Sequence, residues 1–122
     1  MNTVCRFVFV AALLAAMAST ATPAAAFIEA ELLAYSCLAQ LPEAKPDKDA
    51  NSRSVFCNAY IDGWEDAIYT FRQDEKPYCP PAITIKEMSV AFVDYVAAHR
   101  EARHIPAAEA PMLAFKSKWP CR

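Results

Sequence analysis

The stretch SVFCNAYIDGWEDAIYTF, residues 54–71, decides the fold class of this chain. Its apolar side chains recur every three or four residues, which places them on one face of an α-helix. That face consists of Cys57, Tyr60, Ile61, Trp64, Ile68 and Phe71. Polar side chains such as Asn58 fall mostly on the other side. The pattern predicts an amphipathic helix whose apolar face belongs to a protein core and not to a cofactor site.

Gly63 is the only glycine in the sequence, and it lies inside this predicted helix. Sandwiches, barrels and nucleotide-binding folds use glycine in turns and phosphate-binding loops, so its scarcity indicates an all-α fold. Inside a helix, glycine costs about 1 kcal/mol relative to alanine. We therefore expect another helix backbone, or a large ring such as Tyr60 or Trp64, to approach Gly63 closely.

One more helix is expected before this stretch. Residues 28–41 are rich in Ala and Leu, and Pro42 ends the run. The polar segment 42–53 that follows has the composition of a solvated loop. After the central helix, the segment RQDEKPYCPP, residues 72–81, contains three prolines and is typical of a linker.

Two more helices follow the linker. Thr84 and Glu87 have the spacing of a capping box and predict a helix that ends near His99. The last helix is expected to begin near Pro106, with Pro111 either in its first turn or splitting it. The sequence thus predicts a small all-α domain of four helices.

Charged residues offer three candidate surfaces for binding a partner. Asp62, Glu65 and Asp66 form an acidic face, although Asp66 could instead be partly buried and paired with a backbone N–H group or a base. The second surface is the charged segment 42–53. The third is a basic cluster after the third helix, which the negative carbonyl end of that helix also explains: His99, Arg100, Arg103 and His104.

The first 26 residues have the layout of a cleavable export signal. Arg6 precedes an apolar run, residues 7–18, and small residues end at Ala26, where we expect cleavage. The run is shorter than the roughly 20 residues that span a bilayer, so no stable membrane anchor is expected afterwards. Residues 27–122 then form one small exported domain.

Four cysteines remain after the leader and its Cys5 are removed: Cys37, Cys57, Cys79 and Cys121. An even number in an oxidising compartment predicts two disulfides, for which three connectivities exist. Their spacing fits neither a zinc site nor c-type haem attachment, so no metal or cofactor is expected. The mature chain has 14 acidic and 11 basic side chains, which argues against a nucleic-acid partner.

These motifs together resemble one family. The pattern Cys57-Asn-Ala-Tyr60-Ile-Asp-Gly63-Trp-Glu-Asp66, followed by Tyr78-Cys79-Pro80-Pro81, Tyr95-Val-Ala-Ala-His99 and a terminal Trp119-Pro120-Cys121, is similar to the Rap/Tai immunity proteins. The resemblance covers nearly all of residues 27–122. One departure stands after the third helix, where His99-Arg-Glu-Ala-Arg-His104 replaces the usual Glu after a Pro.

The resemblance implies a small, exported, helical protein whose partner is a peptidoglycan amidase toxin delivered into the periplasm by type VI secretion. Such a protein binds and blocks the toxin and performs no chemistry itself. The resemblance also favours a homodimer, which would bury the many aromatic and aliphatic side chains. The alternative is a monomer that holds these side chains in one core. In this family the cysteines and the motif of Tyr60, Gly63 and Asp66 are chiefly structural.

The expected helical hairpin selects a disulfide pairing. Cys37 lies near the end of the first helix and Cys57 near the start of the second, so antiparallel packing brings them together across the 42–53 loop. Cys79 is then left to pair with Cys121. We expect each bridge to contribute roughly 3–4 kcal/mol of stability.

Other functions remain open at this point. A secreted phospholipase would need a His-Asp pair and a glycine-rich calcium loop, and the single Gly63 argues against it. A periplasmic acid-stress chaperone, which would open as carboxylates and histidines gain protons, is the main alternative. It should prevent aggregation of unrelated clients at about pH 2–3, which a dedicated inhibitor should not do. A small envelope-binding protein with no toxin partner is another.

Overall fold

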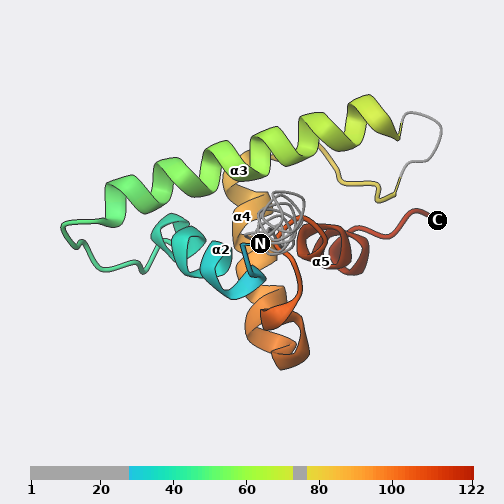
Figure 1. Ribbon diagram of the computed structural model, residues 1–122. Helices are drawn as coiled ribbons and strands as arrows, with labels where there is room; N and C mark the ends of the chain where they lie inside the picture. The colour runs from blue at the N-terminus through green and yellow to red at the C-terminus, as the bar shows by residue number, and fades with distance from the viewer. Residues whose placement is uncertain (1–27, 73–76) are drawn as a thin grey trace, which may run out of the picture.

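The computed structural model describes residues 28–72 and 77–122, and the main elements of this part of the chain are helices (Figure 1). The expected export signal, residues 1–26, lies outside the described residues. Within them no strand is present, and one isolated bridge joins Glu29 to Pro106. The all-α prediction is confirmed. The elements are α2 (Ala30–Cys37), η1 (Leu38–Gln40), α3 (Ala50–Phe71), α4 (Ile85–Ala98), η2 (Arg100–His104) and α5 (Ala110–Lys118).

Helix α4 is the centre of the domain. It packs against α2, α3 and α5, and in Figure 1 it runs behind α3, between α2 and α5. The largest fully buried side chains come from all four α-helices and include Leu33, Ile61, Phe92 and Phe115. Burying these apolar stripes is the main favourable contribution to such a small fold.

Both predicted disulfides are present. The bridge Cys37–Cys57 closes the α2–α3 hairpin, with both residues 0% exposed. The bridge Cys79–Cys121 joins the segment before α4 to the C-terminal tail, and both of its residues are exposed. A backbone hydrogen bond reinforces it, because the Cys79 N–H donates to the Trp119 carbonyl at 2.8 Å.

The start of α3 corrects the predicted boundary. The helix begins at Ala50 and not near Ser54, so the predicted loop 42–53 is shorter than expected. Asp47 explains the difference. Its carboxylate accepts a hydrogen bond from the Asp49 N–H at 2.8 Å and pairs with Arg53 at 2.7 Å, which holds the first turn of the helix in place.

The boundaries of the first and last predicted helices also differ. The predicted helix 28–41 is shorter, since only residues 30–37 are α-helical and a 3₁₀ turn follows. The last helix begins at Ala110 and not near Pro106. Ala30 N–H donates to Ile105 O at 2.9 Å and Ala107 N–H donates to Ile28 O at 2.7 Å, so residues 105–107 pair with the start of α2. Pro111 lies in the first turn of α5 and does not split it.

Helix α4 follows its prediction closely. Thr84 caps its start in a capping box with Glu87: the Glu87 N–H donates to Thr84 Oγ1 at 3.2 Å, and the Thr84 N–H donates to Glu87 Oε2 at 2.7 Å. These two bonds satisfy N–H groups that the helix itself leaves free. The helix ends before His99, as expected.

Candidate functional site

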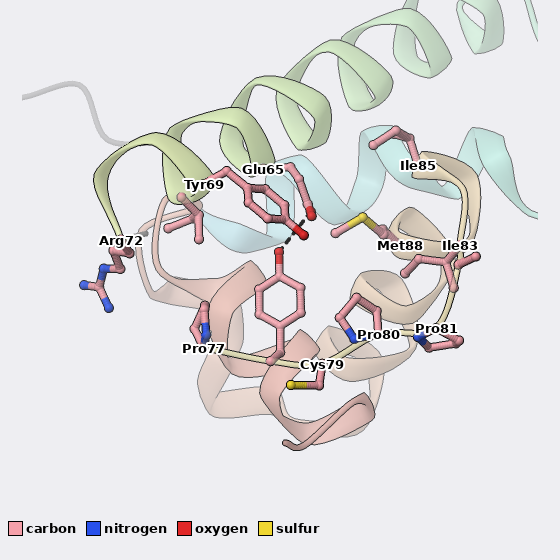
Figure 2. Close-up of a pocket in the computed structure, with 13 residues that line it drawn as sticks. Glu65, Tyr69, Arg72, Pro77, Cys79, Pro80, Pro81, Ile83, Ile85 and Met88 are labelled. Atoms are coloured by element: carbon pink, nitrogen blue, oxygen red, sulfur yellow. Dashed lines mark hydrogen bonds between the residues drawn. The ribbon is translucent and has the colours of Figure 1, made fainter. Parts of the chain in front are cut away.

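A groove opens between the C-terminal part of α3, the segment 77–83 and the start of α4 (Figure 2). Its volume is about 540 Å³, within the range of about 300–1,000 Å³ that is common for binding sites. We call it the Glu65 groove. Its lining residues are Glu65, Ile68, Tyr69, Arg72, Pro77, Tyr78, Cys79, Pro80, Pro81, Ala82, Ile83, Ile85 and Met88.

Tyr78 is fixed at the centre of this groove. Its ring lies 6.3 Å from that of Trp64 and 5.4 Å from that of Phe115, measured between ring centroids. Trp64 is itself anchored, because its indole N–H donates to the Ala108 carbonyl at 2.8 Å. The Tyr78 hydroxyl donates to Glu65 Oε2 at 2.9 Å, shown as the dashed line in Figure 2. The aromatic core therefore sets the position of the Glu65 carboxylate.

The segment 77–81 forms one wall of the groove. Three prolines prevent it from continuing as a helix, so it crosses the gap between α3 and α4 in an extended form. The bridge Cys79–Cys121 and the hydrogen bond from Cys79 N–H to Trp119 O tie it to the C-terminal tail. This segment is therefore already ordered in the free protein, so little conformational entropy is lost there when a partner binds.

Glu65 is electrostatically the most unusual residue of the groove. Burial raises the pKa of its carboxyl group, and the neighbouring charges of Asp62 and Asp66 raise it further, whereas the hydrogen bond from Tyr78 lowers it. Burial, with the hydrogen bond to Glu65, also raises the pKa of Tyr78. Glu65 is therefore a half-buried carboxylate that its surroundings disfavour in the charged form.

The predicted acidic face lies beside this groove. Asp62 and Asp66 are both exposed on α3. Of the two positions considered for Asp66, the structure shows the one that faces solvent. Neither of the two ion pairs found among the described residues involves Asp62, Glu65 or Asp66. Arg72 lines the far edge of the groove, and Figure 2 shows its guanidinium pointing away from Glu65.

Two expectations about α3 are wrong. A Cβ atom added to Gly63 would meet nothing within 4 Å, so no ring or helix backbone approaches it. Phe71, expected on the apolar face, is 84% exposed. The reason is length: α3 has 22 residues, α4 has 14 and α5 has 9, so the end of α3 extends past the core. Tyr60 is half-buried, and burial raises its pKa.

The basic cluster lies at the other end of α4. His99 caps that helix, and its ring stacks on Tyr95 at 4.1 Å between centroids. His104, at the end of η2, lies 3.2 Å from the Glu29 carboxylate. Arg100 is exposed and Arg103 is half-buried. The acidic face and the basic cluster are therefore separate surfaces, because the Glu65 groove opens at the start of α4 and the basic cluster follows the end of that 14-residue helix.

The third candidate surface, segment 42–53, is partly used within the fold. Arg53 belongs to α3, pairs with Asp47, and donates a hydrogen bond to the Tyr35 hydroxyl at 3.1 Å. Its guanidinium carbon also lies 4.7 Å from the centre of the Tyr35 ring. These contacts link α3 to α2, so Arg53 has a structural role in the folded domain.

An apolar face is exposed on α2 and at the start of η1. Leu32, Tyr35 and Leu38 are 55%, 53% and 41% exposed, respectively. A shallow groove of about 520 Å³ runs between them and the residues Val93, Val96 and Ala97 of α4. We call this surface the α2 face.

Within residues 28–72 and 77–122, no group of three or more His, Cys, Asp or Glu side chains is arranged to hold a metal ion. In the same part of the chain, no helix combines the length and the apolar character that crossing a bilayer requires.

Sequence reasoning named Glu65 but missed the groove around it. Tyr69, which is 65% exposed, and the apolar residues Ile83 and Met88 were not identified as binding residues. The three prolines of the linker were the available signal, since an extended segment between two packed helices leaves a gap beside it.

The comparison with protein families gave one match. The family described as Rap1a immunity proteins matches residues 29–121, which include every helix of the structure. No curated protein and no solved structure matches the chain.

Proposed function

Since this chain belongs to the Rap1a immunity protein family, we propose that it binds and inhibits a peptidoglycan amidase toxin delivered by type VI secretion. Membership in the family itself implies a toxin protein as the partner. The match over residues 29–121 is the observation that carries the proposal, because it covers the whole described domain and both disulfides.

The periplasm is the proposed place of action. Two disulfides persist in oxidising compartments and are rare in the cytosol. Residues 1–26 have the composition of an export signal. An amidase that cuts peptidoglycan would meet its substrate in the same compartment, so the producing cell would need its inhibitor there.

Inhibition requires only binding. An amidase of this kind uses a cysteine nucleophile and a histidine base, and covering the cleft that holds them is sufficient to stop the reaction. The chain offers a rigid surface for this purpose, because its helices and its extended segment are held by two disulfides. A rigid surface loses little conformational entropy on binding.

We also propose that the protein forms a homodimer through the α2 face. Three large exposed apolar side chains on α2 and at the start of η1 are an unusual feature for a free surface. The substitution Leu32→Glu should yield a monomer in light scattering where the unchanged protein is a dimer. A wild-type protein that is monomeric at micromolar concentration would contradict this part of the proposal.

The main test uses the oxidised protein and purified type VI amidases. Amidase activity on peptidoglycan is measured while the protein is added in increasing amounts. We expect activity to fall in proportion to the added protein and to vanish near a fixed stoichiometric ratio. Tight binding with no loss of activity would contradict the inhibitory function, and absence of binding to every such amidase would contradict the choice of target.

A further inference from the structure

The Glu65 groove combines a carboxylate with an apolar floor, and this combination constrains what can bind there. Glu65 is half-buried, and Tyr78 is its one hydrogen-bond donor among the described residues. Two further carboxylates, Asp62 and Asp66, lie within one helical turn of it. Like charges this close repel one another, and partial burial strengthens the repulsion because water screens it less.

No basic side chain relieves this repulsion in the described part of the chain. The two ion pairs there are Asp47–Arg53 and Glu29–His104, and both lie elsewhere. Arg72 points away from Glu65 in Figure 2. A cation supplied by a partner would therefore gain attraction from three carboxylates. An anion would be repelled by all three.

Most of the remaining lining is apolar, apart from Arg72 at the far edge and the hydroxyl group of Tyr69. Ile68 comes from α3, Ile83 from the extended segment and Met88 from α4, and together they line the space around the carboxylate. Tyr69 lines the groove and is 65% exposed, and Phe71, at the end of α3, is 84% exposed. Exposed apolar residues bordering a groove are typical of a protein interaction surface.

We propose that the Glu65 groove binds a segment of the toxin that presents a basic side chain next to an apolar one. The basic group pairs with Glu65, and the apolar side chain packs on Ile68, Ile83 and Met88. This inference rests on the proposed function, since the occupant is a segment of the toxin. Arginine fits best, because its planar guanidinium can pair with a carboxylate through two hydrogen bonds.

The first experiment uses two short peptides and needs no toxin. Acetyl-Ala-Leu-Arg-Ala-amide and its counterpart with Glu in place of Arg are titrated into the oxidised, ¹⁵N-labelled protein, and backbone amide shifts are followed by NMR. We expect the Arg peptide to bind weakly and to shift the amides of Glu65, Ile68 and Met88. The Glu peptide should bind at least about tenfold more weakly. Equal binding of the two peptides, or shifts confined to other surfaces, would overturn the inference.

The second experiment uses matched variants and an amidase toxin whose catalytic cysteine is replaced. Glu65→Gln removes the charge while its amide oxygen can still accept the hydrogen bond from Tyr78. Glu43→Gln makes the same change at an exposed position outside the groove. We expect Glu65→Gln to raise the Kd for the toxin by about tenfold or more, and Glu43→Gln to leave it within about twofold.

The two proposals fail in different ways in this experiment. If the unchanged protein does not bind the toxin, the proposed function is wrong. If it binds and Glu65→Gln binds equally well, the function stands and the role of the groove is wrong. Circular dichroism of both variants verifies that any loss of binding is not a loss of folding.

Discussion

Compared with the disulfide Cys37–Cys57, which lies inside the core, the disulfide Cys79–Cys121 lies at the surface beside the Glu65 groove. Cys37 and Cys57 are both 0% exposed, and the Cys57 sulfur is 3.3 Å from the hydroxyl oxygen of Ser89 on α4. Cys79 and Cys121 are both exposed, and Cys79 lines the groove. One bridge is thus part of the packed interior, and the other holds a wall of the candidate binding surface.

This difference indicates a division of roles between the two ends of the molecule. The end around Cys37–Cys57 contains close packing that contributes to the stability of the whole domain. The end around Cys79–Cys121 contains exposed aromatic rings, three carboxylates that repel one another and an extended segment. Exposed apolar side chains of this kind are typical of binding surfaces.

Removing either disulfide is expected to cause the largest losses of stability. The relative size of the two losses tests the proposed difference between the two ends of the molecule. By chain entropy alone, the surface bridge should stabilise the protein more than the core bridge. The expected contributions are roughly 3 kcal/mol for Cys37–Cys57, with a separation of 20 residues, and roughly 4 kcal/mol for Cys79–Cys121, with a separation of 42. Replacing Cys37 and Cys57 by alanine also leaves a cavity in the core, which adds about 2 kcal/mol. We therefore expect that double variant to lose about 5 kcal/mol, more than the Cys79→Ala/Cys121→Ala variant.

Urea denaturation followed by circular dichroism measures both losses. A larger loss for the surface pair would mean that loop closure outweighs core packing. Partial reduction provides an independent check, because thiol access limits exchange. A small thiol should open Cys79–Cys121 at least about tenfold faster than Cys37–Cys57, as judged by alkylation and mass spectrometry.

Loss of the cap of α4 tests how firmly the groove end is fixed. Thr84→Ala removes the hydroxyl that accepts the Glu87 N–H, and the expected cost is about 1 kcal/mol. Thr84→Ser keeps a hydroxyl and should lose much less. Urea denaturation of both variants measures the difference. Equal stability of Ala and Ser at this position would show that the capping box contributes nothing here.

Much of this fold could be predicted because its signals are local. Helix periodicity and the capping box of Thr84 gave the helices, and the hairpin placed Cys37 beside Cys57. The start of α5 was wrong because it depends on a distant contact. The late start of α5 follows from the pairing of residues 105–107 with residues 28–30, which no local pattern in either segment reveals.

The candidate site was less predictable for the same reason. Glu65 could be named from its charge, but its half-burial depends on Tyr78 and on residues from two other elements. Phe71 fits the apolar period of α3 and is nevertheless exposed, because the period describes a face of a helix and not how far the core extends along it.

The substitution Gly63→Ala lies in the middle of α3, between the part of the helix that packs on the core and the part that extends past it. Gly63 has no positive φ angle, and an added Cβ would meet nothing within 4 Å. Alanine should therefore stabilise the helix by about 0.8 kcal/mol. For a domain of this size that gain raises the Tm by about 3–6 °C. A lower Tm in thermal denaturation would reveal a contact at Gly63 that exists only in another state of the protein.

Glu65→Gln gives the smallest expected change in stability. The way in which this change depends on pH tests whether the fold disfavours the charged form of Glu65. The folded protein raises the pKa of Glu65 above its usual value of 4.5, so folding favours the protonated carboxyl group. The Glu65 contribution is therefore neutral at pH 3 and becomes unfavourable as pH rises through the raised pKa. At pH 7 the Gln variant should be more stable by about 0.5 kcal/mol or less. The difference should disappear at pH 3.

Thermal melts of both proteins from pH 3 to pH 7 measure this dependence, with Glu43→Gln, at an exposed position outside the groove, as the control. A variant that is less stable than the wild type at pH 7 would indicate that Glu65 serves the fold through its bond to Tyr78. A more stable variant that also binds the toxin more weakly would separate the two roles. In that case the charge of Glu65 costs stability at the groove end and contributes to binding there.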